Sequence, residues 1–117
     1  MFNLTSKKAL VTGSSRGIGK GIALALAVQG ADVAINYHSK TEEAEKVVME
    51  VKKLGRDSFS IQADVSKSEE VKKMFETVKQ KWDKLDILVN NAGILGFAPF
   101  EEITEKQWDQ LMAVNLK

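Results

Sequence analysis

Cysteine is absent from this 117-residue sequence, and histidine occurs only once. The lack of cysteine excludes disulfide bonds and thiolate metal sites. A single histidine argues against a zinc site, because zinc in proteins is usually held by several histidine or cysteine side chains. The sequence therefore gives no reason to expect a metal centre.

Long apolar runs and an excess of one charge are also missing. The first residues, MFNLTSKK, lack the apolar core of a signal peptide. No run approaches the roughly 20 apolar residues of a membrane span. The formal net charge of +1 offers no attraction for nucleic acid or an anionic membrane. We therefore expect a cytoplasmic protein without nucleic-acid or membrane partners.

Hydrophobic residues make up 44% of the sequence and charged residues 28%, which is typical of a single folded domain, here spanning 1–117. Short apolar segments alternate with helical periodicity. The pattern predicts strands at 9–11, 32–37, 58–63 and 85–89. Such alternation predicts an α/β Rossmann-type doubly wound parallel sheet of order 3-2-1-4, with helices on both faces.

The predicted helices begin near Gly17, near Thr41, near Lys67 and beyond Thr104. Three Ser/Thr-x-x-Glu/Gln pairs resemble capping boxes, in which side chains satisfy the free N–H groups of a helix start. Segment 90–100 contains the only proline and is predicted to be a loop. The three capping pairs are Ser39 with Glu42, Ser66 with Glu69, and Thr104 with Gln107.

A glycine-rich turn follows the first predicted strand. Gly13 would let the chain turn sharply, Gly17 would let a phosphate approach the backbone, and Gly19 would let the helix pack closely. The N–H groups of the helix start then suit a dinucleotide pyrophosphate. The spacing differs from G-x-G-x-x-G and is not that of a P-loop. An ordinary glycine-rich turn is the alternative.

Ligands of parallel α/β sheets bind beyond the carboxyl ends of the strands. Four segments should meet there: the glycine turn, 37–39, 64–65 and 90–93. Asp64 could bind an adenine edge, and Ala92 with Gly93 would admit a ribose. The alternatives are that Asp64 caps a turn, that Asn90 ties strands together, and that His38 is a solvated loop residue.

The residues after the second predicted strand bear on the choice of cofactor. NAD sites commonly place an acidic residue there to bind the ribose 2′-hydroxyl. No acid occurs between Val33 and Thr41, whereas Arg16, His38 and Lys40 are basic or can become so. This balance suits a 2′-phosphate, so we expect NADP(H) to be favoured over NAD(H). Arg16 as a simple surface charge is the alternative.

Four motifs together resemble the short-chain dehydrogenase/reductase family: TGSSRGIG at 12–19, Asp64-Val65, NNAG at 90–93 and VNL at 114–116. Within the family, the chain is most similar to 3-oxoacyl-[acyl-carrier-protein] reductases and to glucose dehydrogenases. The resemblance implies hydride transfer between a nicotinamide cofactor and a carbonyl or alcohol substrate. It also implies a homo-oligomer, a dimer or tetramer.

The resemblance carries site roles to particular residues. Asn115 matches the tetrad asparagine that orders a water and a lysine. The pyrophosphate-binding turn comprises Gly13, Ser14, Ser15, Arg16, Gly17, Ile18 and Gly19. The other expected cofactor-binding residues are Tyr37, His38 and Ser39 after the second strand, Asp64 and Val65 at the adenine, and Asn91, Ala92 and Gly93 along the riboses.

The family's catalytic Ser and Tyr-x-x-x-Lys pair have no match here. The only tyrosine is Tyr37, with Thr41 four residues later. We expect the chain to be the cofactor-binding N-terminal half of such an enzyme, inactive alone. We also expect it to self-associate through an unpaired fourth strand and an exposed last helix. The alternatives are a stand-alone nucleotide-binding module and another Rossmann enzyme such as a methyltransferase, against which the NNAG segment argues.

Overall fold

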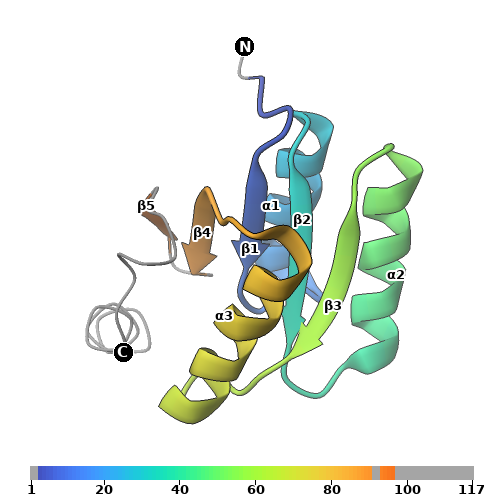
Figure 1. Ribbon diagram of the computed structural model, residues 1–117. Helices are drawn as coiled ribbons and strands as arrows, with labels where there is room; N and C mark the ends of the chain where they lie inside the picture. Colours follow the sequence, from blue (N-terminus) through green and yellow to red (C-terminus); the bar gives the residue numbers. More distant parts are fainter. Residues whose placement is uncertain (1–2, 91–92, 97–117) are drawn as a thin grey trace.

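The computed structural model of the protein describes residues 3–90 and 93–96 (Figure 1). In these residues a five-stranded sheet has the order β3-β2-β1-β4-β5. The strands are β1 (Lys8–Val11), β2 (Asp32–Tyr37), β3 (Ser58–Gln62), β4 (Ile87–Asn90) and β5 (Gly93–Gly96). The helices are α1 (Gly17–Val28), α2 (Thr41–Lys53) and α3 (Ser68–Trp82).

The first four strands confirm the predicted parallel sheet and its order. β1 pairs in parallel with β2 and with β4, and β2 pairs in parallel with β3. Each crossover carries one helix, as parallel neighbours require. The carboxyl ends of these four strands therefore lie at one edge of the sheet.

β5 corrects the prediction that 90–100 is a loop. It runs antiparallel to β4, with Asn90 opposite Gly93 and Val89 opposite Ile94. Only two residues separate the strands, and so short a link permits an antiparallel reversal but not a parallel crossover. The expectation that the outer edge of β4 has no partner is therefore wrong. The last predicted helix, the other basis for self-association, lies outside the described residues.

The apolar core forms two layers, one on each face of the sheet. In β1, Ala9 and Val11 face α1 and α2, whereas Leu10 faces α3. Successive strand residues point to opposite faces, so a strand covered on both sides is apolar throughout. α1 contributes the small residues Ala23 and Ala27, which are fully buried. Figure 1 shows α3 in front of the sheet and α1 behind it.

Neither of the two described capping boxes forms. The N-cap residues of α2 and α3 are Lys40 and Lys67, and neither makes a side-chain cap hydrogen bond. The hydroxyl of Ser66 donates instead to Asp64 Oδ1 at 2.6 Å. α3 therefore begins just beyond Ser66, because that side chain is engaged by the preceding loop. The pair Thr104 and Gln107 lies outside the described residues.

A polar network joins the strands at the amino edge of the sheet. Lys8 pairs with Asp32, whose Oδ1 accepts the N–H of Asp57 at 2.7 Å. Asp57 Oδ2 in turn accepts the indole N–H of Trp82 at 2.8 Å. The Trp82 ring also packs edge-on against Phe59, with 4.9 Å between centroids. These two contacts hold the last turn of α3 to the start of β3.

Candidate functional site

The candidate site lies at the carboxyl edge of the sheet, where three predicted segments meet. The N–H of Thr12, just beyond β1, donates to Val89 O at 2.9 Å. The N–H of Ala63, just beyond β3, donates to Tyr37 O at 3.0 Å. These bonds place the glycine turn, segment 37–39 and segment 64–65 at one edge. Asn90 is buried in β4, whereas Asn91 and Ala92 lie outside the described residues and Gly93 opens β5.

Each glycine of the turn has its own geometric reason. Gly13 and Gly17 have φ angles of 59° and 61°, in the left-handed region that favours glycine. A Cβ on Gly19 would lie 2.2 Å from Gly13 O, so α1 packs directly against the turn. A Cβ on Gly17 would meet no atom within 4 Å. The turn is thus closed on its inner side at Gly19 and open on its outer side at Gly17.

Ser14 has little left to offer a ligand. Its hydroxyl donates to Val11 O at 2.7 Å and accepts the N–H of Asn36 at 3.1 Å. Its own N–H donates to Asn36 O at 2.9 Å. The side chain is fully buried. The structure therefore gives Ser14, predicted to bind cofactor, a supporting place between the turn and β2.

Asn36 is a site residue that sequence reasoning missed. Its side chain is 2% exposed, and its amide joins three segments at the carboxyl edge. Oδ1 accepts the N–H of Gly13 at 3.0 Å, and Nδ2 donates to Ile61 O at 3.2 Å and Ala63 O at 3.3 Å. One signal was present in the sequence, since Asn36 is a polar residue inside the otherwise apolar run VAINY.

The outer side of the turn exposes charged and apolar groups. Arg16 is exposed, stands at the N-cap of α1 and makes no side-chain cap hydrogen bond. Ile18 follows in the first turn of α1, with 75% of its surface exposed. The N–H groups of a first helical turn have no partner within the helix. Together these features present hydrogen-bond donors, a cation and an apolar side chain to one space, while Ser15 is buried.

Asp64 anchors the loop after β3. Its Oδ1 accepts the N–H of Ser66 at 3.0 Å and the hydroxyl of the same residue, so Asp64 caps the turn that opens this loop. Oδ2 lies 3.8 Å from Nε2 of His38. The hydrogen bonds from Ser66, and to a lesser degree the charges of His38 and Lys67, lower the pKa of Asp64. Asp64 is therefore an anionic acceptor facing the end of β2.

Segment 37–40 supplies the facing side of the edge. Tyr37 is half-buried and packs against the core on the α1 and α2 side. His38, Ser39 and Lys40 are exposed, and the main-chain oxygen of His38 accepts Gln62 Nε2 at 3.0 Å. Val65 is half-buried against the core on the α3 side. Ser39 and the two side chains beside it, His38 and Lys40, are thus the exposed members of this segment.

The sequence model of the family described as short chain dehydrogenase matches residues 7–117. The chain belongs to the short-chain dehydrogenase family. A 3-oxoacyl-[acyl-carrier-protein] reductase of Staphylococcus aureus is 50% identical over 112 residues, which cover 96% of this chain and 46% of that protein. A short-chain dehydrogenase/reductase of Pestalotiopsis microspora is 45% identical over 116 residues, covering 99% of this chain and 44% of that protein.

Solved structures of short-chain dehydrogenases have the same fold. The crystal structure of one from Burkholderia cenocepacia J2315, in complex with NADP, superimposes with a TM-score of 0.76. It is 44% identical, and the match covers 97% of this chain and 46% of that one. The chain thus spans less than half the length of the relatives that it matches. Asn115, the expected tetrad residue, lies outside the described residues.

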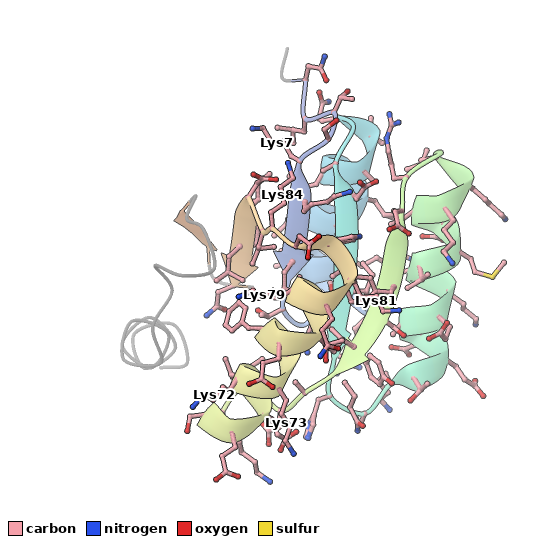
Figure 2. All side chains as sticks on the ribbon, in the orientation of Figure 1. Lys7, Lys72, Lys73, Lys79, Lys81 and Lys84 are labelled. Carbon is pink, nitrogen blue, oxygen red and sulfur yellow. The ribbon has the colours of Figure 1, made fainter. Side chains whose placement is uncertain are left out.

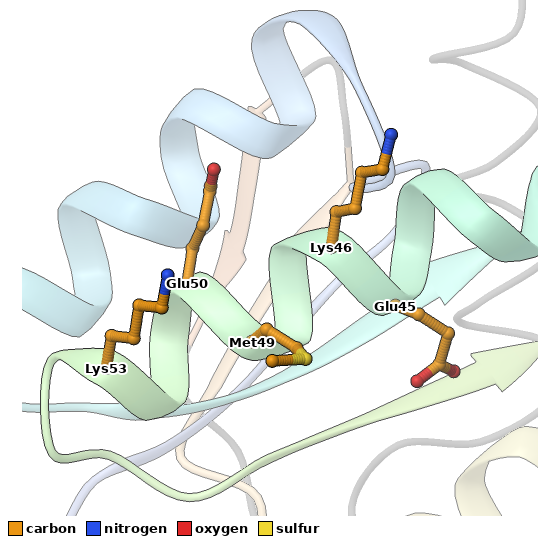
Figure 3. A pocket seen from close by; sticks show the side chains of 5 residues that line it. All are labelled: Glu45, Lys46, Met49, Glu50 and Lys53. Carbon is orange, nitrogen blue, oxygen red and sulfur yellow. The ribbon is translucent and has the colours of Figure 1, made fainter.

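In the described part of this short-chain dehydrogenase chain, no other surface brings such a set of groups together. A hollow of about 350 Å³ on the outer face of α2 is lined by that helix alone, with charges of both signs (Figure 3). Figure 2 shows lysines along α3, yet its four lysines alternate with three glutamates. No described helix is both long and apolar enough to cross a membrane. Within 3–90 and 93–96, no three metal-ligating side chains are grouped.

Proposed function

We propose that this chain is the cofactor-binding part of an NADP(H)-dependent oxidoreductase, which transfers hydride between NADP(H) and a carbonyl or alcohol substrate. The main support for the proposal is the glycine turn, which is closely packed on its inner side and open on its outer side. Gly19 has no room for a Cβ because α1 packs on Gly13, whereas the space over Gly17 is open. A turn pressed against its helix yet open outward suits a pyrophosphate, which needs main-chain N–H groups at close range.

The residues of the edge fit the remaining parts of the dinucleotide. The pyrophosphate would lie on the N–H groups at the start of α1, beside Gly17 and Ile18. The adenine would lie between segment 37–39 and Asp64, whose carboxylate can accept a hydrogen bond from the exocyclic amine. The family resemblance adds Val65 at the adenine and Asn91, Ala92 and Gly93 along the riboses. When bound, the nicotinamide ring supplies or accepts the hydride.

The preference for NADP(H) rests on charge. Arg16 is exposed beside the open side of the turn, and no ion pair within the described residues engages it. No acidic residue follows β2 before Glu42. A guanidinium group suits a phosphate because it offers two parallel N–H donors. The NADP complex of the Burkholderia relative is consistent with this preference.

Catalysis is proposed for the whole protein. The asparagine at 115 would order a water, as the family resemblance implies, but the present sequence contains no Tyr-x-x-x-Lys pair. A general acid at the carbonyl oxygen typically contributes about 10²–10⁴-fold to the rate. We therefore expect residues 1–117 alone to bind the cofactor without reducing a ketone. NADPH oxidation assays on the 117-residue chain and on the full-length protein test this difference.

The cofactor preference is tested by titrating the full-length protein with NADP⁺ and NAD⁺. A charge-assisted contact contributes about 1.5–3 kcal/mol. Arg16→Ala should therefore weaken NADP⁺ binding by about 10- to 150-fold and leave NAD⁺ binding nearly unchanged. Lys46→Ala removes an exposed charge on the outer face of α2 and serves as the matched control. Equal affinities of the unaltered protein for the two cofactors would refute the preference.

A further inference from the structure

The amide of Asn36 connects the two halves of the candidate site. One half is the glycine turn, whose Gly13 N–H donates to Asn36 Oδ1 at 3.0 Å. The other half is the loop after β3, and its first residue, Ala63, accepts from Nδ2 through its main-chain oxygen at 3.3 Å. Asn36 lies between these halves on β2. A buried side chain therefore bridges the proposed pyrophosphate and adenine positions.

The main chain of Asn36 reinforces the same connection. Its N–H donates to the Ser14 hydroxyl at 3.1 Å, and its carbonyl oxygen accepts the Ser14 N–H at 2.9 Å. Beyond the last paired residues of β1 and β2, Val11 and Ile35, these contacts replace the regular ladder. Each polar atom of the Asn36 side chain has a main-chain partner. Satisfied buried polar networks of this kind are rigid.

We propose that Asn36 is a positioning residue for the cofactor, which sets the spacing between the glycine turn and the Asp64 loop without touching the ligand. The inference rests on the proposed function, because it assigns these two segments to the pyrophosphate and the adenine. A dinucleotide spans both segments at once and is sensitive to their spacing. A ligand that occupies the adenine side alone is much less so. Asn36 thus acts on affinity for the whole dinucleotide.

The hydrogen-bond partners of the Asn36 side chain require an amide at this position. Oδ1 must accept from Gly13, while Nδ2 must donate to two carbonyl oxygens. Aspartate has almost the same shape and keeps the acceptor. It turns both donor contacts into repulsion between oxygen atoms, and burial keeps bulk solvent from screening that repulsion. Asn36→Asp therefore disturbs the contact to the β3 end while occupying the same volume.

The experiment compares two ligands on the full-length protein. NADP⁺ spans the site, whereas adenosine lacks both the pyrophosphate and the 2′-phosphate proposed to contact the glycine turn. Asn36→Asp should weaken NADP⁺ binding by about tenfold or more, and adenosine binding by less than about threefold. Asn36→Ala, which leaves the same partners unsatisfied without repulsion, should give the same split if the aspartate variant does not fold.

Ser58→Ala is the matched control. The Ser58 hydroxyl is buried and donates to Val33 O at 2.7 Å, so it also joins β2 to β3, but at the amino edge. Its loss should lower stability and leave both ligand affinities unchanged. If a folded Asn36 variant lost affinity for both ligands equally, or for neither, the positioning role alone would be overturned. Failure of the unaltered protein to bind NADP⁺ would overturn the proposed function and this inference with it.

Discussion

The Gly19→Ala substitution tests how closely α1 packs against the glycine turn. An alanine Cβ at this position would lie 2.2 Å from Gly13 O, 2.9 Å from Gly13 C and 3.1 Å from Ser14 Cα. All three are main-chain atoms and cannot rotate away. Favourable contacts between non-bonded carbon atoms lie at about 3.5–4.0 Å. The helix start must therefore move away from the turn by roughly 1 Å in the Gly19→Ala variant.

The expected loss of stability follows from two opposing terms. Overpacking of a well-filled interior costs about 1–3 kcal/mol, and a clash with main-chain atoms belongs at the upper end. Alanine in place of glycine in a helix recovers up to about 1 kcal/mol. Gly19→Ala should therefore lower the free energy of unfolding by about 2 kcal/mol. Cofactor affinity should fall as well, because the displaced turn carries the proposed pyrophosphate site.

Two other glycines of α1 serve as matched controls. A Cβ on Gly21 would meet no atom within 4 Å, so Gly21→Ala should raise stability by about 0.5–1 kcal/mol. A Cβ on Gly17 would also meet nothing, but its φ of 61° should cost alanine about 1–2 kcal/mol. The same substitution is thus expected to raise stability at Gly21 and to lower it at Gly17 and Gly19, for two different reasons.

Urea unfolding of the full-length protein, followed by far-ultraviolet circular dichroism, measures these differences. The titrations should contain no cofactor, since a bound ligand raises apparent stability by mass action. Comparable slopes of free energy against urea would allow the midpoints to be compared directly. A Gly19→Ala protein as stable as Gly21→Ala would refute the close packing of α1 on the turn.

Two further predictions concern opposite edges of the sheet. Ser66→Ala removes a hydrogen bond that lowers the pKa of Asp64, so this pKa should rise in an NMR titration. Because the folded pKa lies below the unfolded one, Asp64 stabilises the fold above about pH 4 and loses that effect as the pH falls further. An unchanged Asp64 pKa would contradict this. Trp82→Phe removes the N–H donor to Asp57 and should cost about 1 kcal/mol in urea unfolding. NADP⁺ affinity should not change, and a marked loss would show that the two edges are coupled.

The parallel sheet could be predicted because burial leaves a local trace. A strand such as Ile87–Asn90, covered on both faces, must be apolar at nearly every position, and this is visible in the sequence. β5 left no comparable trace, because it contains two glycines and pairs by its position after β4. The capping boxes failed for a tertiary reason. Ser66 has the expected spacing to Glu69, but its hydroxyl donates to Asp64 and does not cap the helix.

In the candidate site, too, some features could be predicted from the local sequence and others depend on contacts between distant residues. The positions of Gly13, His38 and Asp64 follow from the rule that ligands meet the carboxyl ends of parallel strands. The engagement of Ser14 could not be predicted from spacing, because its partner Asn36 is 22 residues away. For the same reason Asn36 was overlooked, since its importance lies in contacts to two other strands. Sequence patterns locate the ends of elements, whereas long-range hydrogen bonds decide which side chains remain available.

The contrast between the inner and outer sides of the glycine turn has an evolutionary consequence. The inner side depends on main-chain contacts and on buried residues such as Asn36, where substitution carries a cost in stability. The outer side carries Arg16, Ser39 and Lys40, which are exposed and make no hydrogen bond or ion pair through their side chains within the described residues. If these outer side chains contact the cofactor as proposed, selection can exchange them, and with them the preferred dinucleotide, without changing the inner side of the turn. Single replacements at these exposed positions should leave the protein folded, whatever their effect on the choice of dinucleotide.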